Sequence, residues 1–90
     1  MLIDPTTDEK TTQEIYVGRN TTIQIQENVL GSGESVLIGT ILGGNFVPLL
    51  YEGEEIKLDE NCHARRFASP MLVNVKKTTT ANPVGVKLVG

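Results

Sequence analysis

Cysteine and tryptophan are nearly missing from this 90-residue sequence, which has one cysteine, Cys62, and no tryptophan. A single cysteine excludes an internal disulfide, whereas small secreted domains usually carry several. No apolar run approaches the ~20 residues that a membrane-spanning helix requires. Residues 1–13 show neither the basic nor the apolar region of a signal peptide. We therefore expect a protein that is made in a reducing cytoplasm and has no membrane partner.

Side chains that carry catalysis are equally scarce. His63 is the only histidine and directly follows Cys62; in an extended chain the two side chains point to opposite faces and cannot form a nucleophile–base pair. One Cys and one His also fall short of the four ligands of a structural zinc site. The acidic residues within the range 52–60 lack the aromatic platforms of sugar-processing clefts and indicate a solvated loop. We predict no enzyme, with no catalytic, metal-binding or cofactor-binding residues.

β-Branched residues are abundant instead. Nine Val, seven Ile and ten Thr make up 26 of the 90 residues, and such side chains favour pleated strands. Apolar and polar residues alternate with a period of two in the ranges 21–27, 55–59, 71–77 and 84–89, which is typical of strands with one wet face. No helical period persists beyond one turn. The sequence predicts an all-β chain, a single small antiparallel β-sandwich of the jelly-roll or Ig-like kind.

The central part of the sequence predicts a hairpin. Residues 35–42 are apolar on both faces, which indicates a central strand, and Gly43-Gly44-Asn45 follows at hairpin spacing. Pro48 lacks the N–H that a ladder needs, so the strand after the turn should be an edge strand or carry a bulge. From the apolar phase of each alternating segment we predict these core residues: Ile23, Ile25, Val36, Ile38, Leu58, Val73, Val75, Val86 and Leu88.

The first thirteen residues differ from the rest in composition. They are polar and aperiodic after Met1, Leu2 and Ile3, so we predict a flexible N-terminal arm at 1–13 and a sandwich domain at 14–90. Three apolar residues ahead of a polar tether suit a segment that adds a strand to the sheet edge of a partner. Met1, Leu2 and Ile3 are therefore candidate partner-binding residues.

Charge is divided unevenly along the chain. Residues 1–60 carry all eleven acids and three bases, whereas residues 61–90 carry five bases and no acid. Either the segments interleave as neighbouring strands and the charges neutralise locally, which we favour, or two surfaces of opposite sign serve docking. In the second case the basic partner-binding residues are Arg65, Arg66, Lys76 and Lys77. An isoelectric point near 5.0 argues against nucleic acid as the partner.

Four segments in succession resemble the small β-sandwich accessory proteins of tailed-bacteriophage virions. They are YVGRN at residues 16–20, which runs into an alternating strand; the hairpin SVLIGTILGGNFVPL at 35–49; PMLVNVKKT at 70–78; and VGVKL at 84–88. The likeness covers roughly residues 14–89.

The resemblance implies a non-enzymatic capsid decoration or cement protein. Such a protein would be made in the host bacterial cytoplasm, bind the capsid exterior and stabilise contacts between major capsid proteins. The small core favours association of copies. From this and the resemblance we expect a homotrimer. The alternatives are a phage tail, fibre or surface glycan-recognition module, and an interaction domain of a cellular protein.

Overall fold

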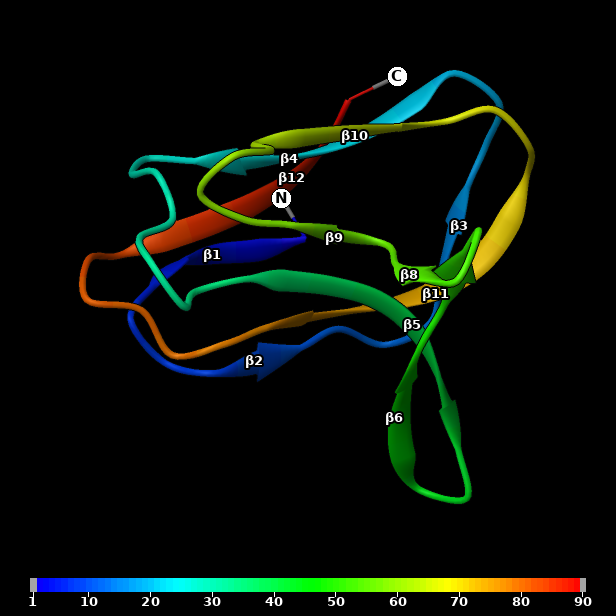
Figure 1. The fold of residues 1–90 in the computed structure, drawn as a ribbon, viewed down its shortest axis with the longest axis horizontal. Coiled ribbons are helices and arrows are strands. Elements are labelled where there is room, and N and C mark those ends of the chain that lie inside the picture. The colour runs from blue at the N-terminus through cyan, green and yellow to red at the C-terminus, as the bar shows by residue number, and fades with distance from the viewer. Residues whose placement is uncertain (1, 90) are drawn as a thin grey trace.

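The computed structural model describes residues 2–89, and within them it contains strands and no helix (Figure 1). Most strands belong to two antiparallel sheets that pack face to face as a small β-sandwich. The first sheet has the order β1-β12-β4-β10, with bounds β1 Ile3–Thr6, β12 Val84–Val89, β4 Thr21–Gln26 and β10 Ala64–Phe67.

The second sheet has the order β2-β11-β5-β6, with bounds β2 Lys10–Thr11, β11 Met71–Lys77, β5 Val36–Leu42 and β6 Asn45–Pro48. Two short strands join it from the side, β3 (Ile15–Val17) on β11 and β9 (Lys57–Leu58) on β5. A separate small ribbon pairs β7 (Leu50–Tyr51) with β8 (Glu54–Glu55). The predicted all-β antiparallel sandwich is confirmed.

The core forms where the apolar phases of the two sheets meet. Its fully or almost fully buried apolar members are Ile3, Val17, Ile23, Leu30, Val36, Ile38, Leu58, Phe67, Val73, Val75, Val84 and Val86. Seven of the nine predicted core residues are among them, and Ile25 packs against them partly buried. Leu88 was predicted wrongly, because it lies past Val86, the last residue of β12 that pairs with β1, and remains 40% exposed.

Deleting buried methyl groups should destabilise this thin core. Val86 is fully buried and pairs with Ile3 on one side and Ile25 on the other. We expect Val86→Ala to lower the free energy of unfolding by about 1–3 kcal/mol, measured by urea denaturation. Val89→Ala, on the exposed end of the same strand, is the control and should change it by a few tenths at most. Equal effects of the two substitutions would contradict this assignment of the core.

The segment predicted as a flexible arm is part of both sheets, so the expected boundary at residue 13 is corrected. Ile3 pairs with Val86 in the first sheet, and Lys10 and Thr11 pair with β11 in the second. Thr12 continues this pairing, because its N–H donates to Val75 O at 2.8 Å and its Oγ1 accepts from Val75 N at 3.0 Å. The chain here has little alternation, and pairing with distant strands decides its structure.

Turn chemistry was easier to predict. Gly43 and Gly44 have φ values of 57° and 83°, as a two-residue hairpin turn requires, and Leu42 pairs with Asn45 across it. Pro48 lies in β6, which is the terminal strand of its sheet as expected. Residues 60–70 show no clear alternation, yet β10 lies within them, because Ile23 and its neighbours in β4 offer a free edge to pair with.

Candidate partner-binding surfaces

The predicted apolar contact residues at the N-terminus do not form a free arm. Met1 lies outside the described residues. Leu2 is half-buried, and its N–H donates to Val86 O at 2.9 Å. Ile3 is only 6% exposed and belongs to the core. Ile3 is therefore committed to the domain itself, which corrects its expected place on a partner.

The four predicted basic residues lie in three different environments. Arg66 is exposed and Arg65 half-buried, both on the edge strand β10. Lys76 is half-buried on β11, with its Nζ 5.7 Å from the centre of the Phe46 ring. Lys77 is fully buried. The structure thus brings Arg65 and Arg66 together and removes Lys77 from the surface.

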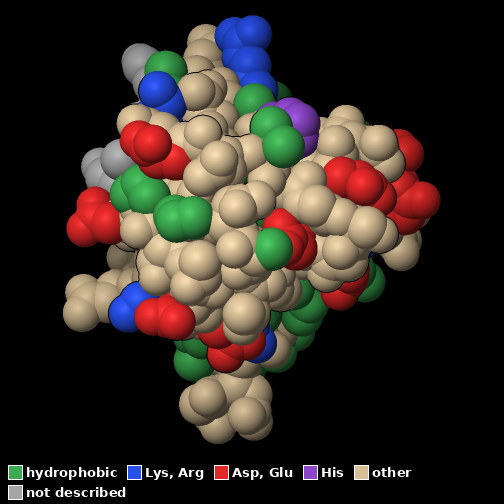
Figure 2. Space-filling view, turned by 90° about the vertical axis from the view of Figure 1, so that its left-hand side faces the viewer, with side chains coloured by type: hydrophobic (Ala, Val, Ile, Leu, Met, Phe, Trp, Pro, Cys, Tyr) green, Lys and Arg blue, Asp and Glu red, His purple; other side chains and the backbone are tan. Residues whose placement is uncertain are grey.

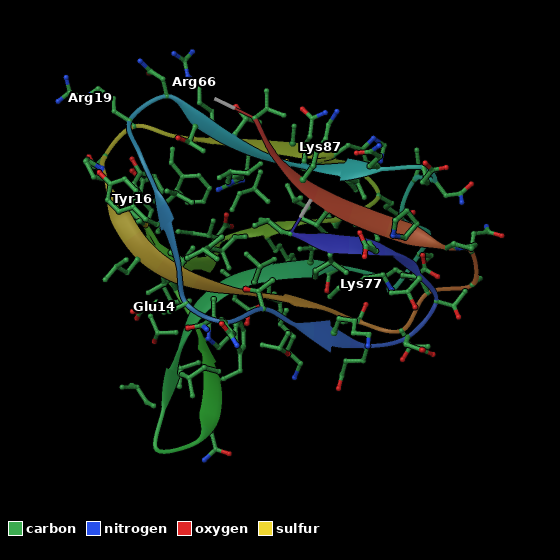
Figure 3. All side chains as sticks on the ribbon, turned by 180° about the vertical axis from the view of Figure 1, so that it is seen from behind. Glu14, Tyr16, Arg19, Arg66, Lys77 and Lys87 are labelled. Carbon is green, nitrogen blue, oxygen red and sulfur yellow. The ribbon has the colours of Figure 1, made fainter. Side chains whose placement is uncertain are left out.

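Lys77 is a structural residue at one end of the sandwich. Its Nζ donates to Asp8 O, Thr78 O and Thr80 Oγ1, each at 3.0 Å, so all three ammonium protons have acceptors. In Figure 3 it points between the two layers, below β1. Burial lowers the pKa of Lys77 from its ordinary value, while the carboxylates of Glu34 and Asp8 act in the opposite direction. The lysine ties the N-terminal segment to the loop after β11.

Glu34 closes the same end of the molecule from the loop before β5. Its Oε1 accepts from Gly31 N at 2.7 Å and its Oε2 from Ala81 N at 2.8 Å. These two backbone hydrogen bonds, more than the nearby Lys77, hold the pKa of Glu34 below its ordinary value. A carboxylate that is better accommodated folded than unfolded adds stability above its unfolded pKa.

We expect Glu34→Gln to lower stability at neutral pH and to change the acid limb of the stability curve. The contribution of Glu34 is present above about pH 4.5 and is lost as the pH falls through the lower pKa of the folded state. The difference in stability between wild type and variant should therefore narrow as the pH falls below about 4.5, as measured by thermal unfolding at a series of pH values. Glu60→Gln, an exposed acid on another loop, is the control. A gap that stays constant below pH 4.5 would contradict this role for Glu34.

The β5–β6 hairpin projects from the body of the sandwich (Figure 1). Its tip carries exposed apolar side chains, with Ile41 at 42% and Leu42 at 63% exposure, and Val47 on β6 is also exposed. Ile41 and Leu42 are neighbours in a strand, so they point to opposite faces of the ribbon. No charged residue occurs in the range 35–51, and the projection at the lower end of Figure 2 carries no Lys, Arg, Asp or Glu colour at its tip.

The base of this hairpin is packed firmly. A Cβ on Gly39 would lie 2.7 Å from Phe46 Cζ and 2.3 Å from Val47 O, so the ring of Phe46 occupies the space that a side chain at residue 39 would need. Lys76 covers the same ring from β11. The two strands of the hairpin are therefore packed closely against each other at its base, with Lys76 of β11 against them.

A hollow of about 320 Å³ lies at the open side of the sandwich, beside β10. One wall consists of five consecutive residues of the chain, 65–69, and the other of the apolar side chains Tyr51, Ile56 and Met71. Next to it, Arg66 Nη2 donates to Asn20 Oδ1 at 2.7 Å. In Figure 3, Arg66 and Arg19 extend from the same corner of the molecule. We call Arg19, Arg65 and Arg66 the basic corner.

Within residues 2–89, no group of three His, Cys, Asp or Glu side chains is placed to hold a metal ion. The Sγ of Cys62 donates to Ala64 O at 3.3 Å, a contact within its own turn. No helix in the described range could cross a membrane. The surfaces that the structure does offer are an apolar hairpin and a hollow with a basic corner, both suited to binding.

Cross-strand neutralisation, the charge interpretation that we favoured from the sequence, has no support in the strand registers. Within the described part of the chain, no registered pair places an acid opposite a base; Lys77, for example, lies opposite Val36 and Lys10. The hairpin tip was missed as a binding surface, although its signal, a charge-free apolar run around a tight turn, is visible in the sequence. The burial of Lys77 was also signalled, since it continues the odd-numbered phase of Val73 and Val75.

Comparison with known proteins found no match: no family model fits the sequence, and no curated protein or solved structure is significantly similar to it.

Proposed function

We propose that this protein is a non-enzymatic structural protein of a tailed-bacteriophage virion, a decoration protein that binds the outside of the capsid and stabilises contacts between major capsid proteins. The single observation that carries the proposal is the projecting β5–β6 hairpin. A two-stranded ribbon is at best marginally stable alone in water, and this one exposes Ile41, Leu42 and Val47 in a stretch of sequence that carries no charge. Such a projection is suited to contact with another protein surface.

The choice of a capsid as that surface is supported by the sequence resemblance to virion accessory proteins. The physical features agree with it, because a sandwich with a projecting apolar hairpin, β5–β6, can bridge neighbouring coat subunits without any catalytic residue. The same role places the protein on the capsid exterior.

Association of copies is part of the proposal, with a homotrimer as the expected state. A 9.8 kDa chain has a small core, and association commonly compensates for this. Sedimentation at micromolar concentration should give about three chain masses, consistent with closed rotational symmetry. A monomer at all concentrations would remove the trimer from the proposal and leave attachment of single copies.

The decisive experiment counts copies in particles. Virions of the phage that encodes this chain are purified on a density gradient, and the protein is quantified by mass spectrometry against the major capsid protein. Hundreds of copies per particle that stay with the heads when heads and tails are separated would support decoration. A few copies that follow the tails would favour the tail, fibre or glycan-recognition alternative. Absence from particles would overturn the virion assignment.

A further inference from the structure

We propose that the open edge of β10 binds an extended acidic segment of a partner protein as an added β-strand. The inference deepens the proposed function and rests on it in so far as the segment belongs to a protein of the same assembly. It uses a surface separate from the hairpin tip, so the two sites can be tested independently.

The first observation is the free edge itself. β10 is the terminal strand of the first sheet, and within residues 2–89 only β4 pairs with it in that sheet. His63 O accepts from Ile25 N at 3.0 Å, on the side of β4. Because backbone groups alternate between the two edges of an antiparallel strand, the N–H groups of Ala64 and Arg66 point to the open side. They form a template for one more strand.

The second observation is that the hollow runs along this edge. Arg65, Arg66 and Phe67 of β10 all line it, although successive side chains of a strand point to opposite faces. A hollow that touches three successive residues of the strand borders its edge as well as one face. It provides room for a chain beside β10.

The third observation is the chemistry of the two walls. Tyr51, Ile56 and Met71 form an apolar wall opposite β10, and Phe67 contributes a buried ring. An added strand would direct every second side chain toward this wall, which selects apolar residues at alternate positions. The intervening side chains would lie on the outward face, beside the guanidinium group of Arg66.

Charge determines what those intervening residues are. Arg65 and Arg66 both line the hollow, and none of its lining residues is acidic; the nearby acids of β8 do not contribute to it. Arg66 is oriented by its hydrogen bond to Asn20, and Arg19 lies in the same turn. Arginine forks bind carboxylates through paired, charge-assisted hydrogen bonds, so the complementary segment carries Asp or Glu.

The position of Arg65 explains why such an edge is selective. Arg65 pairs with Ile23, a core residue, and so lies on the inward face of its strand. Inward-pointing charges on edge strands discourage indiscriminate pairing. The carboxylates of the segment lie on the face of Arg66, so they offset the charge of Arg65 from across the strand and not by direct contact, whereas an apolar strand leaves this charge uncompensated.

The test uses the full chain, labelled with ¹⁵N, and a peptide of alternating glutamate and valine residues as the probe. A lysine–valine peptide of the same length is the matched control. We expect the glutamate peptide to shift the amide signals of β10 and to slow hydrogen exchange at Ala64 and Arg66, with weaker or no shifts in β6. We expect Arg65→Gln with Arg66→Gln to weaken its binding about tenfold or more, and Lys87→Gln, a base on the same sheet outside the hollow, to change it less than about twofold.

Arg66→Lys keeps the charge but loses the fork, so it should weaken binding by less than the double substitution does. Thermal unfolding of the double variant close to that of wild type excludes a loss caused by misfolding. Equal binding of the lysine–valine peptide, or unchanged exchange at Ala64 and Arg66 on saturation, would overturn the proposal. The two proposals fail separately. Absence of the protein from particles would overturn the virion function and leave the peptide result intact. Loss of peptide binding would overturn the added strand and leave the copy number in particles unchanged.

Discussion

Replacing Lys77 with alanine is expected to lower the free energy of unfolding by about 3–5 kcal/mol, the scale of removing a long buried side chain. The substitution empties the space of a fully buried stem and takes the donor away from Asp8 O, Thr78 O and Thr80 Oγ1 together. Since small domains are stable by only about 5–15 kcal/mol, a large share of the fold would be lost. Urea denaturation at neutral pH measures the effect.

Two further variants separate the cavity from the hydrogen bonds. Lys77→Met keeps an apolar stem and removes the charged donor, so it should cost less, about 1–3 kcal/mol. Lys76→Ala, at the half-buried neighbouring position, should cost less than either. If Lys77→Ala and Lys76→Ala were equally mild, the lysine would not be the tie that its contacts indicate.

The pH dependence of stability that Lys77 causes has a definite sign. Burial lowers the pKa of Lys77 in the folded state below the ordinary value of 10.5. Between the folded-state pKa and 10.5, the unfolded chain therefore binds more protons than the folded one. Stability of the wild type should therefore rise with pH there. Lys77→Met lacks this titration, and the difference between the two proteins should widen as the pH approaches 10.5.

How far the sequence predicts this fold depends on whether a segment carries its own pattern. β4 and β11 alternate cleanly and were predicted, because each strand has one face to bury. β1, β2 and β10 have mixed composition, and their structure comes from hydrogen bonds to strands far away in the sequence. Contacts of that kind leave little trace in local periodicity.

The binding surfaces show the same division. Arg65 and Arg66 were identified from charge alone, but the hollow beside them exists only because Tyr51 and Ile56 fold back opposite β10. Ile3 was given to a partner for its hydrophobicity, and the domain itself uses that hydrophobicity. Composition thus indicated which residues are available for binding, while the strand order decides which of them reach the surface.

Replacing Ile41 and Leu42 with threonine is expected to weaken attachment to particles about tenfold to 100-fold. The side chains of Ile41 and Leu42 are 42% and 63% exposed in the isolated protein, so docking can gain about half of the roughly 1.5–3 kcal/mol that full burial of each would contribute; every 1.4 kcal/mol changes affinity about tenfold. Threonine keeps the preference for a strand, so the turn at Gly43 and Gly44 should still form. Cosedimentation with particles produced without the gene for this protein measures the affinity.

Leu88→Thr with Val89→Thr is the matched control for this change. These residues of β12 have nearly the same exposure as Ile41, at 40% and 42%, but lie on the body of the sandwich and not on the projecting hairpin. Removing them should alter the affinity less than about threefold, since exposed apolar residues outside an interface contribute little. Thermal unfolding of both double variants should stay close to wild type, which ties any loss of attachment to the surface itself. If the two double variants lost affinity equally, or the hairpin variant bound as the wild type does, the hairpin would not be the element that docks.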